Sequence, residues 1–166
     1  MKELLETDRL KLREFNISDA QNLYQLNLEP EVIKYTGDLP FYNIGEAEIF
    51  LKNYKEYEKN GFGRWAVIEK KSNKFIGWCG FKLNEENYID IGFRFLKSEW
   101  KKGFATESAK SCIEYGFEKL NLSLIVARTS EQNYSSQKVL EKIGMTFWKK
   151  QQCKVLGQTL YYRIEK

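Results

Sequence analysis

The stretch with the most chemical information joins an expected strand over residues 88–96 to a helix that the periodicity places from Thr106. Between them the chain reads Trp100-Lys101-Lys102-Gly103-Phe104-Ala105-Thr106-Glu107. The small residues at 103 and 105 let the backbone approach a ligand, and the first N–H groups of a helix have no intrahelical partners. Such a turn can bind pyrophosphate, helped by the charges of Lys101 and Lys102. A glycine needed only for close strand–helix packing is the alternative.

A second polar pair stands at the start of the next expected helix, over residues 133–143. Asn133 and Ser136 follow a buried strand directly and belong to that helix's first turn. Both residue types are good N-caps, so helix capping is the alternative to contact with a ligand. Ser136 is also a candidate proton donor, with a local helix-start hydrogen bond as its alternative.

Asp90 is the candidate general base. The sequence contains no histidine, which removes the usual general base and every Ser-His or Cys-His nucleophile. Any chemistry must therefore use carboxylates, hydroxyls, backbone amides or water. Alternation along the strand puts Asp90 on one face with Gly92 and Arg94. An ion pair of Asp90 with Arg94, Arg128 or a lysine is the competing interpretation, because structural pairs outnumber catalytic carboxylates.

The elements that must position these residues alternate between strand and helix periodicity. The pattern predicts a strand over 9–15 and helices starting at 18, near 30 and over 43–59. It then predicts strands over 64–69, 74–83 and 88–96, a helix over 106–120, a strand over 124–129 and a helix over 133–143. Two strands close the chain within 145–166, around a turn at Leu156-Gly157-Gln158.

This order indicates an α+β (mixed α/β) domain spanning residues 1–166. Short polar turns predict an antiparallel meander for the three central strands, and the helix over 106–120 predicts one parallel β-α-β crossover. A phosphate site would lie at that crossover. Apolar residues make up 42% and charged residues 30% of the chain, which excludes the composition typical of disordered proteins.

The charge and the cysteine content indicate which kinds of ligand and which cellular compartment the chain fits. The net charge of +4 is scattered, which argues against a nucleic-acid surface but suits a small polyanion. Three widely spaced cysteines fit neither a disulfide framework nor a metal site and favour a reducing compartment. An apolar leader and a stretch long enough to span a membrane are both lacking, so we expect a cytoplasmic protein without a membrane partner.

Together these motifs resemble the GNAT superfamily of N-acetyltransferases, in detail its ribosomal-protein-alanine acetyltransferase-like branch. The run from Trp100 to Ser108 is similar to W-G-K-G-Y-A-T-E-A, and the run from Asn133 to Met145 to N-x-x-S-x-x-V-x-E-K-x-G-F. The opening from Thr7 to Arg13 is similar to T-x-R-L-x-L-R. The chain departs from the pattern at Lys101, where glycine is usual; a side chain fits the turn there if the φ of Lys101 is negative.

The resemblance implies a GNAT fold, with a strongly twisted, mostly antiparallel sheet of six to seven strands flanked by helices. It implies acetyl-CoA as cosubstrate and no metal. Backbone groups of residues 93–96 would pair with the pantetheine amides like an added strand, and Asn133 would touch the same arm. The residues assigned to cofactor binding are Phe93, Arg94, Phe95, Leu96, Lys101, Lys102, Gly103, Phe104, Ala105, Thr106, Asn133 and Ser136.

The expected reaction is direct attack by a neutral primary amine on the acetyl thioester in a ternary complex. The N–H of Phe95 would polarise the carbonyl, Ser136 would protonate the thiolate, and Asp90 would act as base directly or through water. The acceptor stays open among a protein N-terminal alanine or serine, a polyamine, an aminoglycoside and an amino acid. A monomer and a homodimer are both compatible. The alternative function is a catalytically idle acyl-CoA-binding sensor or scaffold.

Overall fold

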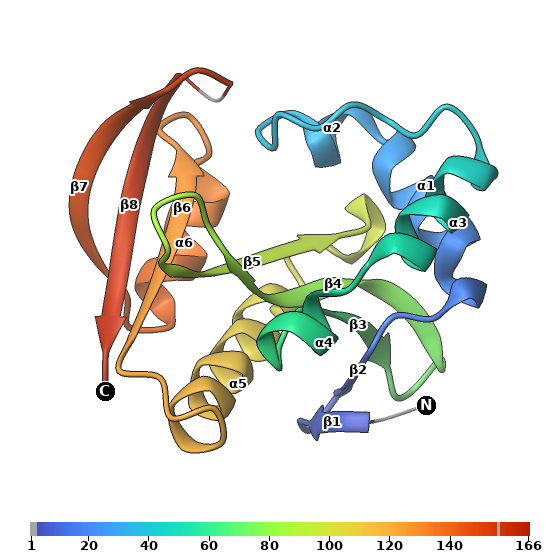
Figure 1. Cartoon of the computed structure of the whole chain (residues 1–166), viewed down its shortest axis with the longest axis horizontal. Coiled ribbons are helices and arrows are strands. Elements are labelled where there is room, and N and C mark those ends of the chain that lie inside the picture. Colours follow the sequence, from blue (N-terminus) through green and yellow to red (C-terminus); the bar gives the residue numbers. More distant parts are fainter. Residues whose placement is uncertain (1–2, 156) are drawn as a thin grey trace.

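The computed structural model describes residues 3–166 except Leu156, and its centre is one eight-stranded sheet (Figure 1). The spatial order is β1-β2-β3-β4-β5-β6-β8-β7. The strands are β1 (Glu3–Glu6), β2 (Leu10–Arg13), β3 (Arg64–Glu69), β4 (Lys74–Leu83), β5 (Ile89–Phe95), β6 (Leu124–Ser130), β7 (Thr146–Cys153) and β8 (Gly157–Glu165).

The expectation of six to seven strands is wrong by one. The additional strand is β1, which pairs antiparallel with β2 and has only four residues, too few to display a period of two. The three central strands form the predicted antiparallel meander. Of the predicted turn before β8, Leu156 lies outside the described residues, and Gly157 and Gln158 belong to the strand itself.

The helices differ in length and in the face of the sheet that they cover. They are α1 (Ala20–Leu28), α2 (Pro30–Ile33), α3 (Ile44–Asn53), α4 (Glu56–Asn60), α5 (Phe104–Glu118) and α6 (Tyr134–Lys142), with 3-10 turns η1 (Ile17–Asp19) and η2 (Lys97–Glu99). None of these helices in the described chain is long and apolar enough to span a membrane.

The single helix expected over 43–59 is wrong, because α3 and α4 are separate helices. Tyr54 interrupts them with an extended backbone (φ −75°, ψ 97°). Its hydroxyl accepts a hydrogen bond from the backbone N–H of Arg64 at 2.7 Å. The Tyr57 hydroxyl accepts from the N–H of Phe15 at 3.0 Å and donates to the carbonyl of Arg64. The break lets two tyrosines on successive helices satisfy backbone groups beside β3.

Two apolar clusters cover the two faces of the sheet. The larger packs α5 against the central strands and includes Trp65, Phe81 and Ile113. The smaller lies under α1 and α3 on the opposite face and includes Leu26 and Trp78. Figure 1 shows α5 on one side of the central strands and α1 and α3 on the other. The central strands are therefore buried on both faces.

The sheet has very little strand pairing between β5 and β6. Strands β5 and β6 run parallel, as predicted for the crossover through α5, and pair at Asp90 and Val126. Beyond Asp90 the two strands diverge, and in Figure 1 β6 rises steeply away from β5. Neighbouring antiparallel pairs are much longer, with seven paired positions each between β4 and β5 and between β6 and β8. A wedge therefore opens between β5 and β6 along the carboxyl-terminal half of β5.

Candidate functional site

The N-terminus of α5 lies beyond the carboxyl end of β5 and has no side-chain cap. Its N-cap residue is Gly103, with φ +83°, a conformation that glycine adopts without strain. The Gly103 carbonyl accepts from Glu107 N at 3.0 Å, while the amides of the first turn lack intrahelical partners. An uncapped helix start at the carboxyl edge of parallel strands is a favourable position for an anion.

Lys101 does not meet the condition of a negative φ. Its φ is +62°, in the left-handed region that a side chain disfavours by about 1–2 kcal/mol. The turn therefore has the backbone shape that a glycine would allow, although this chain places a lysine there. The next residue, Lys102, is held through its carbonyl by Arg9, which supports the turn.

A cluster that sequence reasoning missed fixes this turn, centred on Arg9 and Glu107. The Glu107 carboxylate accepts from the Thr7 hydroxyl at 2.5 Å, from Arg9 N at 3.0 Å and from Arg9 Nε at 2.7 Å. Arg9 Nη1 donates to the Lys102 carbonyl at 2.9 Å, and the guanidinium lies 4.6 Å from the ring centroid of Phe104. Burial raises the pKa of Glu107, but the hydrogen bonds from Thr7 and Arg9 outweigh it, so the net pKa is lowered.

The sequence motifs already contained the three residues of this cluster: Thr7 and Arg9 in the T-x-R run, and Glu107 in the first turn of α5. The resemblance included Thr7, Arg9 and Glu107, but their spacing of about a hundred residues gave no reason to pair them. We call this group, with Lys102 and Phe104, the Arg9 cluster.

The backbone of β5 offers two amides to the wedge. The N–H of Leu96 donates to Ile76 O at 3.0 Å, so Leu96, and with it Arg94, directs its polar groups toward β4. Because successive residues of a strand point to opposite edges, the amides of Phe93 and Phe95 face the wedge. The Phe95 carbonyl already accepts from the indole of Trp100 at 2.9 Å. Of the four predicted pantetheine partners, Phe93 and Phe95 are therefore the two that direct backbone groups toward the wedge. In the part of the chain that the structure describes, the backbone of Phe93 and the N–H of Phe95 remain without a partner on that side.

Asn133 and Ser136 lie at the start of α6, beyond the carboxyl end of β6. Asn133 Oδ1 accepts from Ser136 N at 3.2 Å, so the capping alternative is observed. Within the described residues, Asn133 Nδ2 and the Ser136 hydroxyl have no protein partner, which leaves both available to a ligand. Since β5 and β6 are parallel, the starts of α5 and α6 lie at the same edge of the sheet.

Asp90 lies where β5 and β6 begin to diverge and is buried. Its Oδ2 accepts from Arg128 Nε at 2.5 Å, so the ion pair that the sequence allowed is present. Arg128 also contacts Glu85 at 2.8 Å. Burial raises the pKa of Asp90, and the charges of Arg128 and Lys82 oppose this without cancelling it. A raised pKa makes the carboxylate a better proton acceptor.

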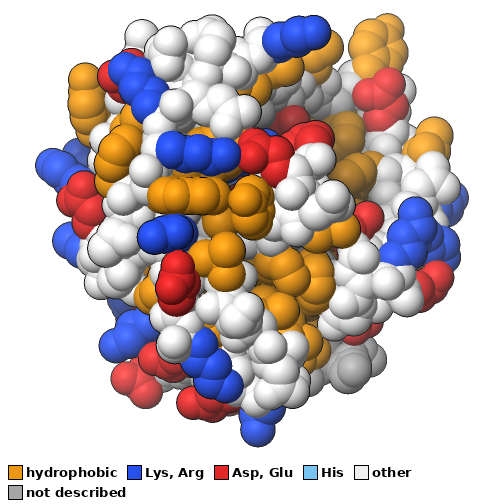
Figure 2. Space-filling model, turned by 60° about the vertical axis from the view of Figure 1, so that its left-hand side comes forward, with side chains coloured by type: hydrophobic (Ala, Val, Ile, Leu, Met, Phe, Trp, Pro, Cys, Tyr) orange, Lys and Arg blue, Asp and Glu red, His pale blue; other side chains and the backbone are white. Residues whose placement is uncertain are grey.

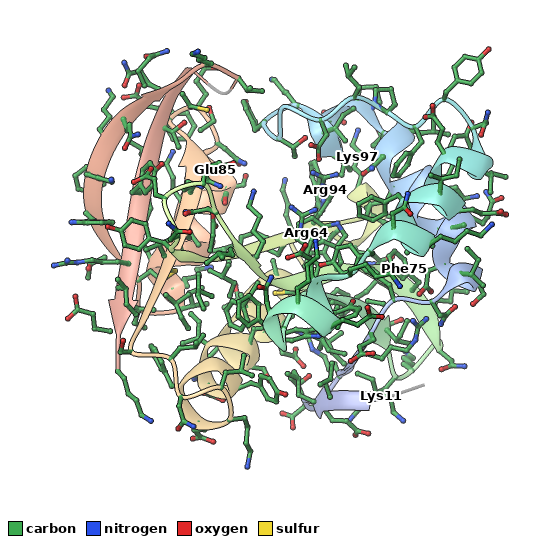
Figure 3. The ribbon with its side chains drawn as sticks, viewed as in Figure 1. Lys11, Arg64, Phe75, Glu85, Arg94 and Lys97 are labelled. Carbon is green, nitrogen blue, oxygen red and sulfur yellow. The ribbon has the colours of Figure 1, made fainter. Side chains whose placement is uncertain are left out.

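A pocket of about 220 Å³ lies on the face of β5 opposite α5. Asp90, Gly92 and Arg94 point to this face, because Ile91 and Phe95 pack into the α5 cluster. Figure 3 shows Arg94 and Arg64 close together near its centre. The lining residues are Phe15, Leu23, Asn27, Asp38, Leu39, Phe41, Phe50, Arg64, Trp78 and Arg94.

The side chain of Arg94 is the most buried charge in this pocket. Its Nη1 donates to Asn27 Oδ1 at 2.7 Å and its Nη2 to Asp38 Oδ2 at 2.5 Å. Arg94 and Arg64 both lie over the ring of Trp78, at 5.4 and 4.4 Å from its centroid. Burial lowers the pKa of Arg94, Asp38 opposes this, and the charge of Arg64 adds to the lowering. The sequence suggested a cofactor contact through the Arg94 backbone or an ion pair with Asp90, but the Arg94 side chain pairs with Asp38, and Asp90 pairs with Arg128.

A second hollow, of about 340 Å³, lies between β1 and the carboxyl-terminal half of α5 and is lined by Leu4, Leu5, Ser111, Glu114, Tyr115, Glu118 and Lys119. On the face in Figure 2, hydrophobic side chains gather in the middle, with acidic and basic side chains interspersed around them. Among residues 3–155 and 157–166, no group of three or more Cys, Asp or Glu side chains is placed to hold a metal. The wedge, the two helix starts and the pocket beside Trp78 are thus the features that carry chemical information.

Comparisons with known proteins agree on one family. The sequence model of the acetyltransferase (GNAT) domain matches residues 9–146. The uncharacterized N-acetyltransferase p20 of Bacillus licheniformis is 35% identical over 145 residues, covering 86% of this chain and 82% of the relative. A GNAT-family acetyltransferase from Bacillus anthracis superposes with a TM-score of 0.82 at 28% identity, over 96% of both chains. The spermidine N-acetyltransferase of Vibrio cholerae, solved with CoA and spermine, shares the fold with a TM-score of 0.81 at 19% identity, over 96% of both chains.

Proposed function

This chain belongs to the GNAT family of acetyltransferases and is an acyltransferase, and from this premise we propose that it transfers the acetyl group of acetyl-CoA to a primary amine. The observation that carries the proposal is the wedge between β5 and β6, which ends at the uncapped start of α5. The unpaired edge of β5 is suited to the amides of an extended arm, and the uncapped helix start is suited to a pyrophosphate. A ligand that contains both groups would fit the two features together.

The cofactor would lie along β5 with its pyrophosphate on the amides of residues 101–106. Phe93 would pair with the pantetheine arm in the wedge, and Asn133 Nδ2 would donate to the same arm from α6. The Arg9 cluster supports this arrangement because it ties the Lys102 carbonyl and the first turn of α5 to the segment before β2. The amides therefore need little reorganisation to bind the anion.

In the reaction, the amine nitrogen would attack the thioester carbonyl carbon directly, and the carbon–sulfur bond would then break. The N–H of Phe95 would stabilise the negative charge on the carbonyl oxygen. Asp90 stands five residues before Phe95 on β5, so it would accept the amine proton through intervening water, using the carboxylate oxygen that Arg128 does not hold. The Ser136 hydroxyl would donate a proton to the departing sulfur and regain one from solvent.

The decisive experiment is a calorimetric titration with acetyl-CoA and with CoA, followed by thiol release over a panel of amines and peptides. We expect micromolar binding and release with at least one class of acceptor. Failure to bind either compound would contradict the site. Binding without transfer to any amine would instead favour an acyl-CoA sensor or scaffold.

The Asp90 role is tested by the variant Asp90→Asn. A base that only deprotonates the acceptor should be replaceable by raising the pH, since a neutral amine then needs no base. We expect D90N to lose activity near neutral pH and to recover most of it at higher pH. A loss that is constant across pH would assign Asp90 to the structural pair with Arg128 instead.

A further inference from the structure

The pocket beside Trp78 has an unbalanced charge. Arg64 and Arg94 supply two cations, and Asp38 is the one carboxylate among the lining residues. The Arg94 side chain is 8% exposed, whereas its partner Asp38 is 50% exposed. A counterion that is half in water compensates a buried charge only partly. The pocket therefore keeps an excess of positive charge on its inner side.

Hydrogen-bond donors in the pocket also lack acceptors. Arg94 Nε is buried and has no partner within the described residues. The guanidinium of Arg64 lies over Trp78 and, over the same described ranges, contacts neither a carboxylate nor a carbonyl. Arg94 Nε is inaccessible and the Nη atoms of Arg94 are bound to Asn27 and Asp38, so Arg64 is the guanidinium with donors left for a ligand. The unpaired donors of Arg64, next to the buried charge of Arg94, favour an anionic acceptor.

The size and lining of the pocket limit what that anion belongs to. A volume of about 220 Å³ is below the roughly 300–1,000 Å³ of pockets for drug-sized ligands. Aromatic rings of Phe15, Phe41, Phe50 and Trp78 form much of the wall. A single apolar or aromatic side chain with one carboxylate fits both properties, whereas a polyamine would add positive charge beside two guanidinium groups.

The pocket is also adjacent to the proposed reaction centre. Arg94 stands between Phe93 and Phe95 on β5, and its side chain points to the pocket while their amides face the wedge. A molecule whose carboxylate binds beside Arg64 and Arg94 would place its amine near the segment of β5 proposed to hold the thioester. The pocket lies on the face of residues 93–95, and the wedge lies along their edge.

We propose that the pocket formed by Arg64, Trp78 and Arg94 binds the carboxylate of the acceptor, so that the acceptor class is a small amino acid-like amine. This inference rests on the proposed acetyl transfer for its catalytic meaning. The binding of a carboxylate can be measured without any turnover.

The test uses CoA-loaded protein titrated by calorimetry with phenylalanine, tyrosine, leucine and methionine, each compared with its own carboxamide. We expect at least one acid to bind at least tenfold more tightly than its amide. In Arg64→Gln this preference should fall about tenfold to a hundredfold, the range for a charged hydrogen bond. Comparing each acid-to-amide ratio between the two proteins cancels differences in amine pKa.

Arg163→Gln is the matched control, because Arg163 also stacks on a tryptophan, 5.3 Å from the ring of Trp148, and lies outside the pocket. It should leave the acid-to-amide ratio unchanged. Equal affinity for acids and amides, no binding by any of the four pairs, or an unchanged ratio in R64Q would overturn the inference. Thiol release with the same ligands is scored separately. Its absence with every amine would contradict acetyl transfer, while the affinity ratio would still decide the carboxylate subsite.

Discussion

Ser136 lies in the first turn of α6, where its hydroxyl could act on the departing thiolate. Its backbone N–H is held by Asn133, and its hydroxyl has no partner in the described part of the chain. We expect Ser136→Ala to lower kcat by about a hundredfold, in the lower range for a general acid, because the departing thiolate loses its proton donor. CoA affinity by calorimetry should stay the same, since the capping contact uses the backbone.

Ser135→Ala is the control for this prediction, because Ser135 is exposed on the same helix turn. It should keep full turnover. Full turnover in S136A as well would restrict Ser136 to the helix start.

At the residue scale the sequence predicted the uncapped helix start and the residues at the start of α6, but not the side-chain contacts around them. The turn before α5 and the Asn133 cap of α6 could be predicted because each is local, within one turn and the helix that follows. The Arg9–Glu107 pair could not, since residues 98 positions apart meet only through the packing of β2 beside α5. The positive φ of Lys101 was also missed, because tertiary contacts overrode the preference of a lysine for negative φ.

At the scale of elements, the Arg9 cluster couples the N-terminal strand segment to the start of α5. The lowered pKa of Glu107 means that its contribution to stability is complete above the ordinary pKa of a glutamate, about 4.3. That contribution is lost as the pH falls through the lowered value in the folded protein. We expect Glu107→Gln to weaken CoA binding about tenfold at neutral pH and to flatten the loss of thermal stability below pH 4.

The matched control is Glu114→Gln, which removes a carboxylate from an exposed position of the same helix. CoA affinity equal to wild type in E107Q, with an unchanged acid profile, would show that the cluster does not hold the turn.

The break between α3 and α4 gives a second prediction for an element. Tyr57→Phe removes the acceptor of the Phe15 N–H and the donor to the Arg64 carbonyl. Partly buried backbone groups left unpaired should lower the free energy of unfolding by about 1–3 kcal/mol. Thermal or urea unfolding measures this loss, and Tyr42→Phe, at an exposed tyrosine, should change stability little. If Tyr57→Phe is as stable as Tyr42→Phe, water replaces the Tyr57 hydroxyl as the partner of these backbone groups.

The same break shows where pattern reasoning fails for elements. The apolar residues from Ala47 to Tyr57 keep a helical spacing, so periodicity alone predicted one helix. The interruption follows from hydrogen bonds to β3, which lies later in the chain. By contrast, β3 and β4 have the predicted bounds because each is a short apolar run, and a polar turn separates each run from the next strand.

For the whole molecule, the core should protect two of the three thiols. Cys79 and Cys112 are fully buried with their sulfurs 3.6 Å apart, and burial raises the pKa of Cys112. Cys153 is partly exposed. We expect a thiol reagent to titrate one cysteine rapidly in the native protein and three after unfolding in urea. Rapid reaction of two or three thiols under native conditions would mean that the α5 face opens readily.

The short contact between β5 and β6 has a consequence for the order of folding. The strands β3 to β5 meet through brief turns, and β7 and β8 form their own antiparallel pair, so each side can assemble from contacts near in sequence. The parallel contact at Asp90 and Val126 closes a long loop through α5 and gains little pairing in return. We therefore expect the two halves of the sheet to form early and to dock late, with α5 as the element that both halves share.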